Sequence, residues 1–156
     1  MVKIMIVRRE VSCGVLLFQD RPRRSFLLLL NNERIDLPKG RMEPRESELE
    51  CALRELEEET GIAAHLVERI VECPERLRYD LPQELRSKLW GGKWIGQDQD
   101  WYLCRFLGRD SDVDIATKHP EFREWRWVDP EQLPDLIVPF KRDLYRRLIA
   151  EFADFL

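Results

Sequence analysis

Short runs of apolar side chains alternate with charged or proline-containing turns along most of the chain. Runs of this length that are rich in Val, Leu, Phe and Trp are typical of β-strands. The pattern predicts strands at residues 11–19, 25–31, 64–73, 99–107 and 124–128. The first two are joined by a basic turn and form a hairpin. Residues 35–38 are short and extended, and residues 78–82 are expected to interrupt regular structure.

Two other stretches carry apolar residues at helical spacing. The first begins near Ser47, where acidic residues mark a helix start, and ends at Gly61, which suits a left-handed cap. Its apolar positions are Leu49, Ala52, Leu53 and Leu56. The second covers residues 140–155, with apolar positions Leu144, Leu148, Ile149, Phe152 and Phe155. With a short helix predicted at residues 83–88, these elements favour an α/β fold with a mixed sheet between helices, an α/β/α sandwich.

Composition narrows the class of protein. The 156 residues are 44% hydrophobic and 36% charged, which indicates a single folded domain over residues 1–156. The net charge of −4 argues against a general nucleic-acid coat. Four widely spaced cysteines predict reduced thiols. No signal peptide is apparent, and the longest apolar stretch, residues 26–30, is too short to span a bilayer. We therefore expect a cytoplasmic protein with no membrane contact.

The first helix carries three carboxylates on one side. Glu55, Glu58 and Glu59 stand at positions i, i+3 and i+4, where like charges repel and reduce helix stability. A hard divalent cation would turn these oxygens into a binding site. Arg54 lies beside them and is able to hold a carboxylate through a two-pronged hydrogen bond. Taken alone, such a helix face is more often solvated surface.

The wider segment 40–62 resembles the Nudix box. Its fixed positions are filled by Gly40, Glu46, Arg54, Glu55, Leu56, Glu58, Glu59, Gly61 and Ile62. The resemblance implies a Nudix fold and hydrolysis of a pyrophosphate linkage with Mg²⁺, for which Mn²⁺ substitutes. It implies that Glu55, Glu58, Glu59 and the Gly40 carbonyl hold the metal, with Glu58 and Arg54 acting in catalysis. We expect Glu46 to pair with Arg54. Lys39 and Arg41 flank the loop and are candidates to hold phosphate, or else are ordinary solvated cations.

Segments in the second half sharpen the resemblance. They are Tyr79-Asp80-Leu81-Pro82, Ile95-Gly96-Gln97, Pro120-Glu121-Phe122, Trp125-Arg126-Trp127-Val128 and Phe140-Lys141-Arg142 with Tyr145. The same segments in the same order are typical of bacterial RNA pyrophosphohydrolases and related dinucleoside polyphosphate hydrolases, which this chain resembles. The resemblance implies that Glu121 joins the metal site as a ligand or base. It also implies that Tyr79 and Phe140 clamp a base and that Lys141 meets phosphate.

The loop before the helix leaves the substrate open. RNA pyrophosphohydrolases usually carry Pro-Gln-Gly-Gly, whereas this chain has Pro38-Lys39-Gly40-Arg41, which is similar to animal-type and archaeal diadenosine tetraphosphate hydrolases. The substrate is therefore expected to be a dinucleoside polyphosphate or an RNA 5′ end. A nucleotide-pool or nucleotide-sugar hydrolase of the 8-oxo-dGTP or ADP-ribose type, a non-catalytic nucleotide-binding domain and an interaction surface formed by tryptophans are the alternatives. Nothing in the sequence requires a protein partner.

Overall fold

The computed structural model describes residues 8–32 and 34–156. Within these residues one mixed sheet has the strand order β3-β2-β1-β7-β5, while β4 pairs with β1, β6 with β7 and β8 with β2. The strands are β1 (Arg9–Gln19), β2 (Ser25–Leu30), β3 (Ile35–Asp36), β4 (Lys39–Arg41), β5 (Val67–Glu72), β6 (Leu77–Asp80), β7 (Gly96–Phe106) and β8 (Glu124–Val128). The two longest strands, β1 and β7, run parallel through the centre, from Arg9 opposite Gly96 to Phe18 opposite Arg105.

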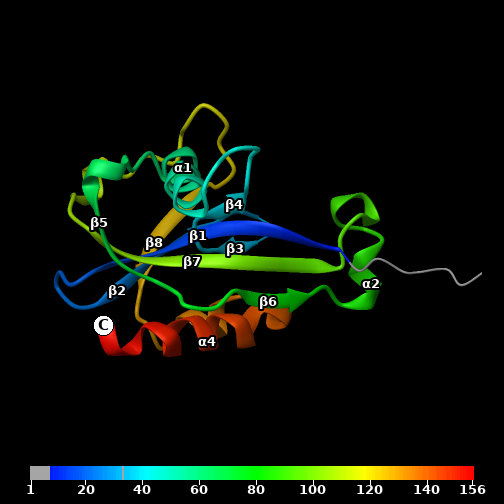
Figure 1. Ribbon diagram of the computed structural model, residues 1–156. Coiled ribbons are helices and arrows are strands. Elements are labelled where there is room, and N and C mark those ends of the chain that lie inside the picture. The colour runs from blue at the N-terminus through cyan, green and yellow to red at the C-terminus, as the bar shows by residue number, and fades with distance from the viewer. Residues whose placement is uncertain (1–7, 33) are drawn as a thin grey trace, which may run out of the picture.

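Helices cover both faces of this sheet, as Figure 1 shows with α1 on one side and α4 on the other. The helices are α1 (Glu48–Thr60), α2 (Gln83–Arg86), α3 (Leu133–Leu136) and α4 (Arg142–Phe152). Successive side chains of a strand point to opposite faces. Val15 and Leu17 of β1 accordingly join the core under α1, whereas Leu16 and Phe18 join the core against α4. The predicted α/β/α sandwich is confirmed, and in the described residues no helix is long and apolar enough to cross a membrane.

Two strand predictions need correction. Residues 64–66 form a 3-10 helix, so that β5 begins only at Val67. The predicted interruption at residues 78–82 is wrong for its first part, because Leu77–Asp80 is a strand that pairs antiparallel with β7. Leu77 and Tyr79 point into the core while Arg78 and Asp80 stay exposed, which is the alternation of a half-buried strand.

The predicted C-terminal helix is shorter than the apolar pattern suggested. Residues 139–141 and 153–155 form 3-10 turns at its two ends. Leu144, Leu148 and Phe152 are buried as expected, but Phe155 is 48% exposed. The tighter winding beyond the end of α4 changes the direction of the last side chains, so Phe155 does not continue the apolar face.

Three of the tryptophans considered as an interaction surface pack in or against the core instead. Trp101 is fully buried in the core. Trp125 and Trp127 contact each other edge to face, with ring centroids 6.3 Å apart, and pack partly buried against the core under α1. The side chain of Trp90 lies outside the described part of the chain.

Candidate active site

The acidic helix α1 is fixed at both ends by local hydrogen bonds. Ser47 is its N-cap and accepts a hydrogen bond from the Glu50 N–H at 3.1 Å. Gly61 ends it in the left-handed conformation, with φ of 73°, as the sequence predicted. Cys51, Ala52 and Leu56 are buried against the sheet. Glu55 and Glu59, which lie at other positions of the helix, face strand β4.

Strand β4 passes so close to α1 that a side chain at Gly40 has no room. A Cβ atom built there would lie 2.0 Å from Cδ of Glu55, well inside van der Waals contact. The Cys51 thiol lies 3.5 Å from the Gly40 carbonyl oxygen. The close packing of β4 on α1 brings the Gly40 backbone beside the Glu55 carboxylate. Both groups must be this close if they belong to one metal site.

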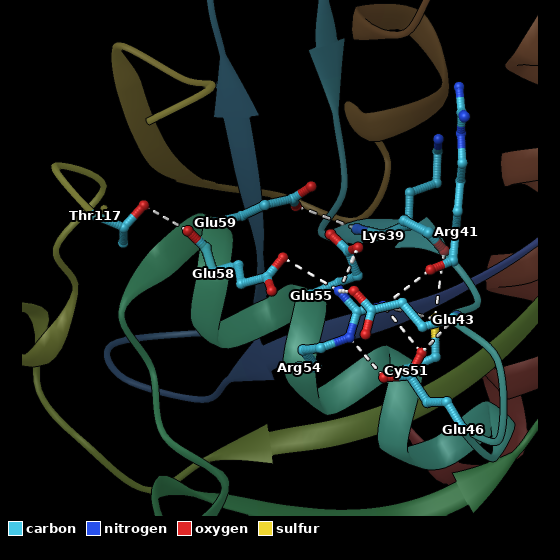
Figure 2. A network of polar contacts seen from close by, with 11 residues as sticks. Lys39, Arg41, Glu43, Glu46, Cys51, Arg54, Glu55, Glu58, Glu59 and Thr117 are labelled. Carbon is cyan, nitrogen blue, oxygen red and sulfur yellow. Dashed lines mark hydrogen bonds and ion pairs between the residues drawn. The ribbon is translucent and has the colours of Figure 1, made fainter. Parts of the chain in front are cut away.

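Arg54 connects the loop with the helix glutamates (Figure 2). Its guanidinium donates two hydrogen bonds to Glu46, at 2.5 and 2.9 Å, so the predicted pair is confirmed. The same group donates to Glu55 at 2.9 Å and to Glu58 at 3.2 Å. A further bond of 2.9 Å reaches the Arg41 carbonyl. Arg54 thus sets the positions of two candidate metal ligands through five planar donors.

Glu59 is the deepest carboxylate of the site, with only 6% of the residue exposed. It accepts a hydrogen bond from the Lys39 backbone N–H at 3.2 Å. Burial raises the pKa of Glu59 well above its usual value, and the nearby Glu121 and Glu55 carboxylates raise it further. Burial also raises the pKa of Glu55, against the opposing effect of Arg54. Burial and neighbouring carboxylates therefore both disfavour the charged form of Glu59, and a bound cation would offset both.

The loop before β8 carries Glu121 to the same place. It is attached to the end of α1 by a hydrogen bond from the Asp114 N–H to the Thr60 carbonyl, at 2.8 Å, and by one from the Thr117 hydroxyl to the Glu58 carbonyl, at 2.5 Å. Glu121 is exposed and accepts a hydrogen bond from Arg34 at 2.9 Å. Thr117 of this loop, 59 residues from Glu58 in the sequence, thus ties the loop to the acidic helix α1.

Two cavities lie on either side of these carboxylates. One of about 680 Å³ is lined by Glu43, Glu55, Glu58, Glu59 and Glu121 together with the cations Arg34, Lys39, Arg41, Arg54 and Lys141. The other, of about 630 Å³, is lined by Glu57, Glu58, Glu59 and Glu121 with Arg54, Thr117, Lys118 and His119. Glu58, Glu59 and Glu121 therefore form a ridge between a cleft with as many cations as carboxylates and a more acidic one.

The donor set fits a hard divalent cation. Among the described residues no group of three acidic, His or Cys side chains stands close enough to hold an ion in the present side-chain positions. Arg54 bonds one oxygen of the Glu55 carboxylate and one of the Glu58 carboxylate, which leaves the second oxygen of each for a cation. The raised pKa of Glu59 reflects its burial and the neighbouring carboxylates, whose charge a cation would neutralise, and carboxylate and carbonyl oxygens are the ligands Mg²⁺ prefers.

The candidate phosphate-binding residues lie on the cationic side of the ridge. Arg41 forms an ion pair with the buried Glu10, and Lys141 donates a hydrogen bond to Asp36 at 3.2 Å. Lys39 lies 3.6 Å from the same Asp36 oxygen. Lys39, Arg41 and Lys141 all line the 680 Å³ cavity, which brings together residues that are up to 102 positions apart in the printed sequence.

The two candidate base-stacking residues contact each other. The Tyr79 and Phe140 ring centroids are 5.8 Å apart with an angle of 43° between the ring planes. Tyr79 is only 6% exposed, and the Lys141 ammonium lies over its ring at 5.4 Å. A base inserted between two rings needs about 7 Å, which is twice a van der Waals contact. The clamp therefore remains a prediction that requires Phe140 to move away from Tyr79.

Sequence reasoning missed several polar residues of the cleft. Arg34, which holds Glu121, and Gln97, which lines the cavity, were not proposed as site residues. Neither was Asp36, which is buried under the two lysines. Their roles depend on tertiary contacts. A single Asp or Arg in a short extended segment forms no sequence pattern that would indicate such a role.

The comparisons with known proteins agree with this geometry. A NUDIX domain model matches residues 4–148. An RNA pyrophosphohydrolase of Erythrobacter litoralis is 55% identical over 117 residues, covering 74% of this chain and 71% of that protein. An RNA pyrophosphohydrolase of Sphingopyxis alaskensis is 48% identical over 144 residues, covering 90% and 91%. A C. elegans Ap4A hydrolase in a binary complex has a TM-score of 0.69 at 22% identity, covering 93% of this chain and 98% of that one. The E. coli dihydroneopterin triphosphate pyrophosphohydrolase has a TM-score of 0.70 at 18% identity, covering 94% of this chain and 99% of that one.

Proposed function

The chain belongs to the Nudix family of hydrolases, and we propose that residues 1–156 form a single domain whose substrate is the 5′-triphosphate end of RNA. It is a pyrophosphohydrolase, an enzyme that acts on phosphoric anhydrides. The relative from Sphingopyxis alaskensis, similar over nine tenths of both chains, supports the choice of RNA. The observation that carries the proposal is the ridge of Glu58, Glu59 and Glu121 beside a cleft lined by Lys39, Arg41, Lys141 and two further arginines.

The residues of the ridge suit the reaction. Glu55, Glu58, Glu59, Glu121 and the Gly40 carbonyl are the groups we propose to hold Mg²⁺, or Mn²⁺ in its place. When bound, the cation neutralises phosphate charge and lowers the pKa of bound water. Glu58 lines both cavities, and we propose it as the group that accepts a proton from the attacking water. Arg54 holds Glu55 and Glu58 in position, since it contacts both.

The cations of the cleft suit the substrate. Lys39, Arg41 and Lys141 line the same cavity as the glutamates, so a phosphate chain lying there meets positive charge next to the proposed cleavage site. Phe140 is half-buried at the edge of this region and offers a ring on which the first bases of an RNA would stack without regard to sequence.

A dinucleoside polyphosphate is the second candidate. Lys39 and Arg41, which flank Gly40 in the sequence, favour this candidate. They place two positive charges in the lining of the cleft. A dinucleoside tetraphosphate has one more phosphate in its chain than a triphosphate end, so its charge is spread over a longer stretch of these cations. The C. elegans hydrolase supports this candidate only through its fold.

Product analysis separates the two candidates. A short 5′-triphosphorylated RNA and diadenosine tetraphosphate are incubated with the protein and Mg²⁺ at equal concentrations. We expect release of pyrophosphate, or of phosphate in two steps, from the RNA at the higher kcat/KM. Conversion of the dinucleotide to ATP and AMP with the RNA intact would replace the first candidate by the second.

Two variants test whether the ridge is responsible. Glu58→Gln is expected to lose most turnover at saturating Mg²⁺ with an unchanged circular dichroism spectrum. Glu50 is exposed on the same helix, and Glu50→Gln serves as the matched control. Near-normal turnover of Glu58→Gln would remove Glu58 from the proposed site.

A further inference from the structure

A buried carboxylate lies beneath the cationic wall of the cleft. Asp36 of β3 is 2% exposed, and one of its oxygens accepts hydrogen bonds from the Tyr145 hydroxyl and from the Leu37 N–H. Its other oxygen faces two ammonium groups, Lys141 at 3.2 Å and Lys39 at 3.6 Å. Asp36, Lys39, Lys141 and Tyr145 are called the Asp36 cluster below.

The cluster joins the core to the cleft. Tyr145 of α4 is fully buried and packs edge to face on Trp101, with ring centroids 5.9 Å apart. At the other end, Lys39 and Lys141 line the cavity that also contains Glu58 and Glu59. Lys39 belongs to β4 and Lys141 to the turn before α4, so the carboxylate links two separate segments of the chain. A core contact thereby fixes the positions of two cations at the cleft.

The charges of the cluster do not balance. Two ammonium groups share one carboxylate oxygen, and their side chains are only 11% and 13% exposed. Burial lowers the pKa of Lys141, while the Asp36 carboxylate opposes that effect. Although burial alone would raise it, the pKa of Asp36 lies below its usual value because of Lys39, Lys141 and the Tyr145 hydroxyl. Within the cluster one positive charge is in excess, and Lys39 also interacts electrostatically with the nearby Glu59 carboxylate.

From this arrangement we propose that Asp36 is a positioning residue, which holds the Lys39 and Lys141 ammonium groups against the cleft so that together they bind the phosphates beyond the cleaved bond. Each ammonium has three donors and directs only part of them to Asp36, which leaves donors for a phosphate oxygen. Without the carboxylate, two like charges would stand together in a poorly solvated place and would turn apart or lose a proton. The inference rests on the proposed function for its placement of the phosphates.

The test measures anion binding without turnover. Inorganic tripolyphosphate is titrated into the protein by calorimetry in the absence of divalent cations, for the wild type, Asp36→Asn, Lys39→Gln and the double variant. We expect each single substitution to weaken binding about tenfold, as loss of one buried charged partner does. The double variant is expected to bind no worse than the weaker single variant, because the two residues act as a unit. Unchanged or tighter binding by Asp36→Asn, or additive losses, would overturn the proposal.

A second pair of variants covers the case in which Asp36→Asn does not fold. Tyr145→Phe keeps the ring that packs on Trp101 and removes only the hydroxyl that binds Asp36. We expect it to weaken tripolyphosphate binding about threefold, the loss of one modest hydrogen bond. Asp143→Asn changes an acid of the same helix whose side chain is 97% exposed, and is expected to bind like the wild type. Wild-type affinity in Tyr145→Phe would count against the positioning role.

Kinetics separates this inference from the proposed function. With the hydrolysed substrate, the Asp36 and Tyr145 variants are expected to raise KM while kcat stays within about threefold, the mark of lost binding rather than lost chemistry. If the wild type hydrolyses neither substrate but still shows Asp36-dependent tripolyphosphate binding, the proposed function fails and the anion site stands. If it hydrolyses RNA and the variants match it in KM, only the positioning role fails.

Discussion

The Arg54 guanidinium and the Glu46 carboxylate are joined by two hydrogen bonds, at 2.5 and 2.9 Å, across the loop that precedes α1. Glu46 also accepts the Glu43 N–H at 3.0 Å, so the pair closes the loop on itself. The remaining donors of Arg54 reach the helix glutamates. A residue with no place in the metal site therefore determines where two of its candidate ligands lie.

Glu46 should make the free energy of unfolding decrease as the pH becomes acidic. The hydrogen bonds from Arg54 lower the pKa of Glu46 from 4.5 to about 2 in the folded protein. A depressed carboxyl pKa stabilises the folded state above the ordinary value of 4.5, and this stabilisation is lost as the pH falls toward about 2. Thermal unfolding of Glu46→Gln should show a lower Tm than the wild type at neutral pH, with the difference disappearing in acid. A constant difference across that range would mean that Glu46 acts through packing.

Arg54→Lys should reduce catalysis without unfolding the protein. A lysine ammonium has no planar fork, so it is unable to bind Glu46 in a bidentate way and reach Glu55 and Glu58 at once. We expect kcat to fall about tenfold to a hundredfold, the range seen when residues around a metal site are lost. Arg69→Lys, on an exposed position of β5, is the control. Equal kcat in both variants would assign Arg54 a purely structural role.

Glu121→Gln should weaken metal binding. Glu121 lies next to Glu59 closely enough to raise its pKa, and it shares both cavities with Glu58. Loss of one carboxylate ligand is expected to weaken Mn²⁺ affinity about tenfold or more, measured by titration of the bound ion's magnetic resonance signal. Glu124→Gln is a nearby exposed control. If both variants bind Mn²⁺ like the wild type, Glu121 is no ligand.

The box glutamates were predictable because their spacing is local. Glu55, Glu58 and Glu59 lie on the same side of a helix whatever surrounds it. Ser47 and Gly61 mark the ends of that helix, because serine favours the N-cap and glycine favours the left-handed C-terminal position. The central strands were predictable for a similar reason, since the apolar runs at residues 15–18 of β1 and 101–104 of β7 are buried on both faces. The polar first residues of β7, Gly96 to Asp98, were not predicted as strand.

Other features depend on contacts that the sequence does not encode locally. Strand β6 begins three residues after Pro74 and has only four residues, so its pairing with β7 outweighs a weak local preference. The role of Asp36 depends on Lys141 and Tyr145, which are more than a hundred residues away. Arg34 meets Glu121 only because β2 and β8 are neighbours in the sheet.

Phe140→Ala tests the predicted stacking of a base. The Phe140 ring contacts Tyr79 and is partly buried against the core, so a stacking role requires it to move when substrate binds. If it stacks, the substitution should cost about 1–3 kcal/mol of substrate binding, seen as a higher KM for triphosphorylated RNA. Tripolyphosphate carries no base, so its affinity should stay unchanged in this variant. Phe155→Ala removes a ring that is 48% exposed at the end of the chain and serves as the control. A loss of tripolyphosphate binding together with a lower Tm would instead return Phe140 to a packing role that supports Lys141.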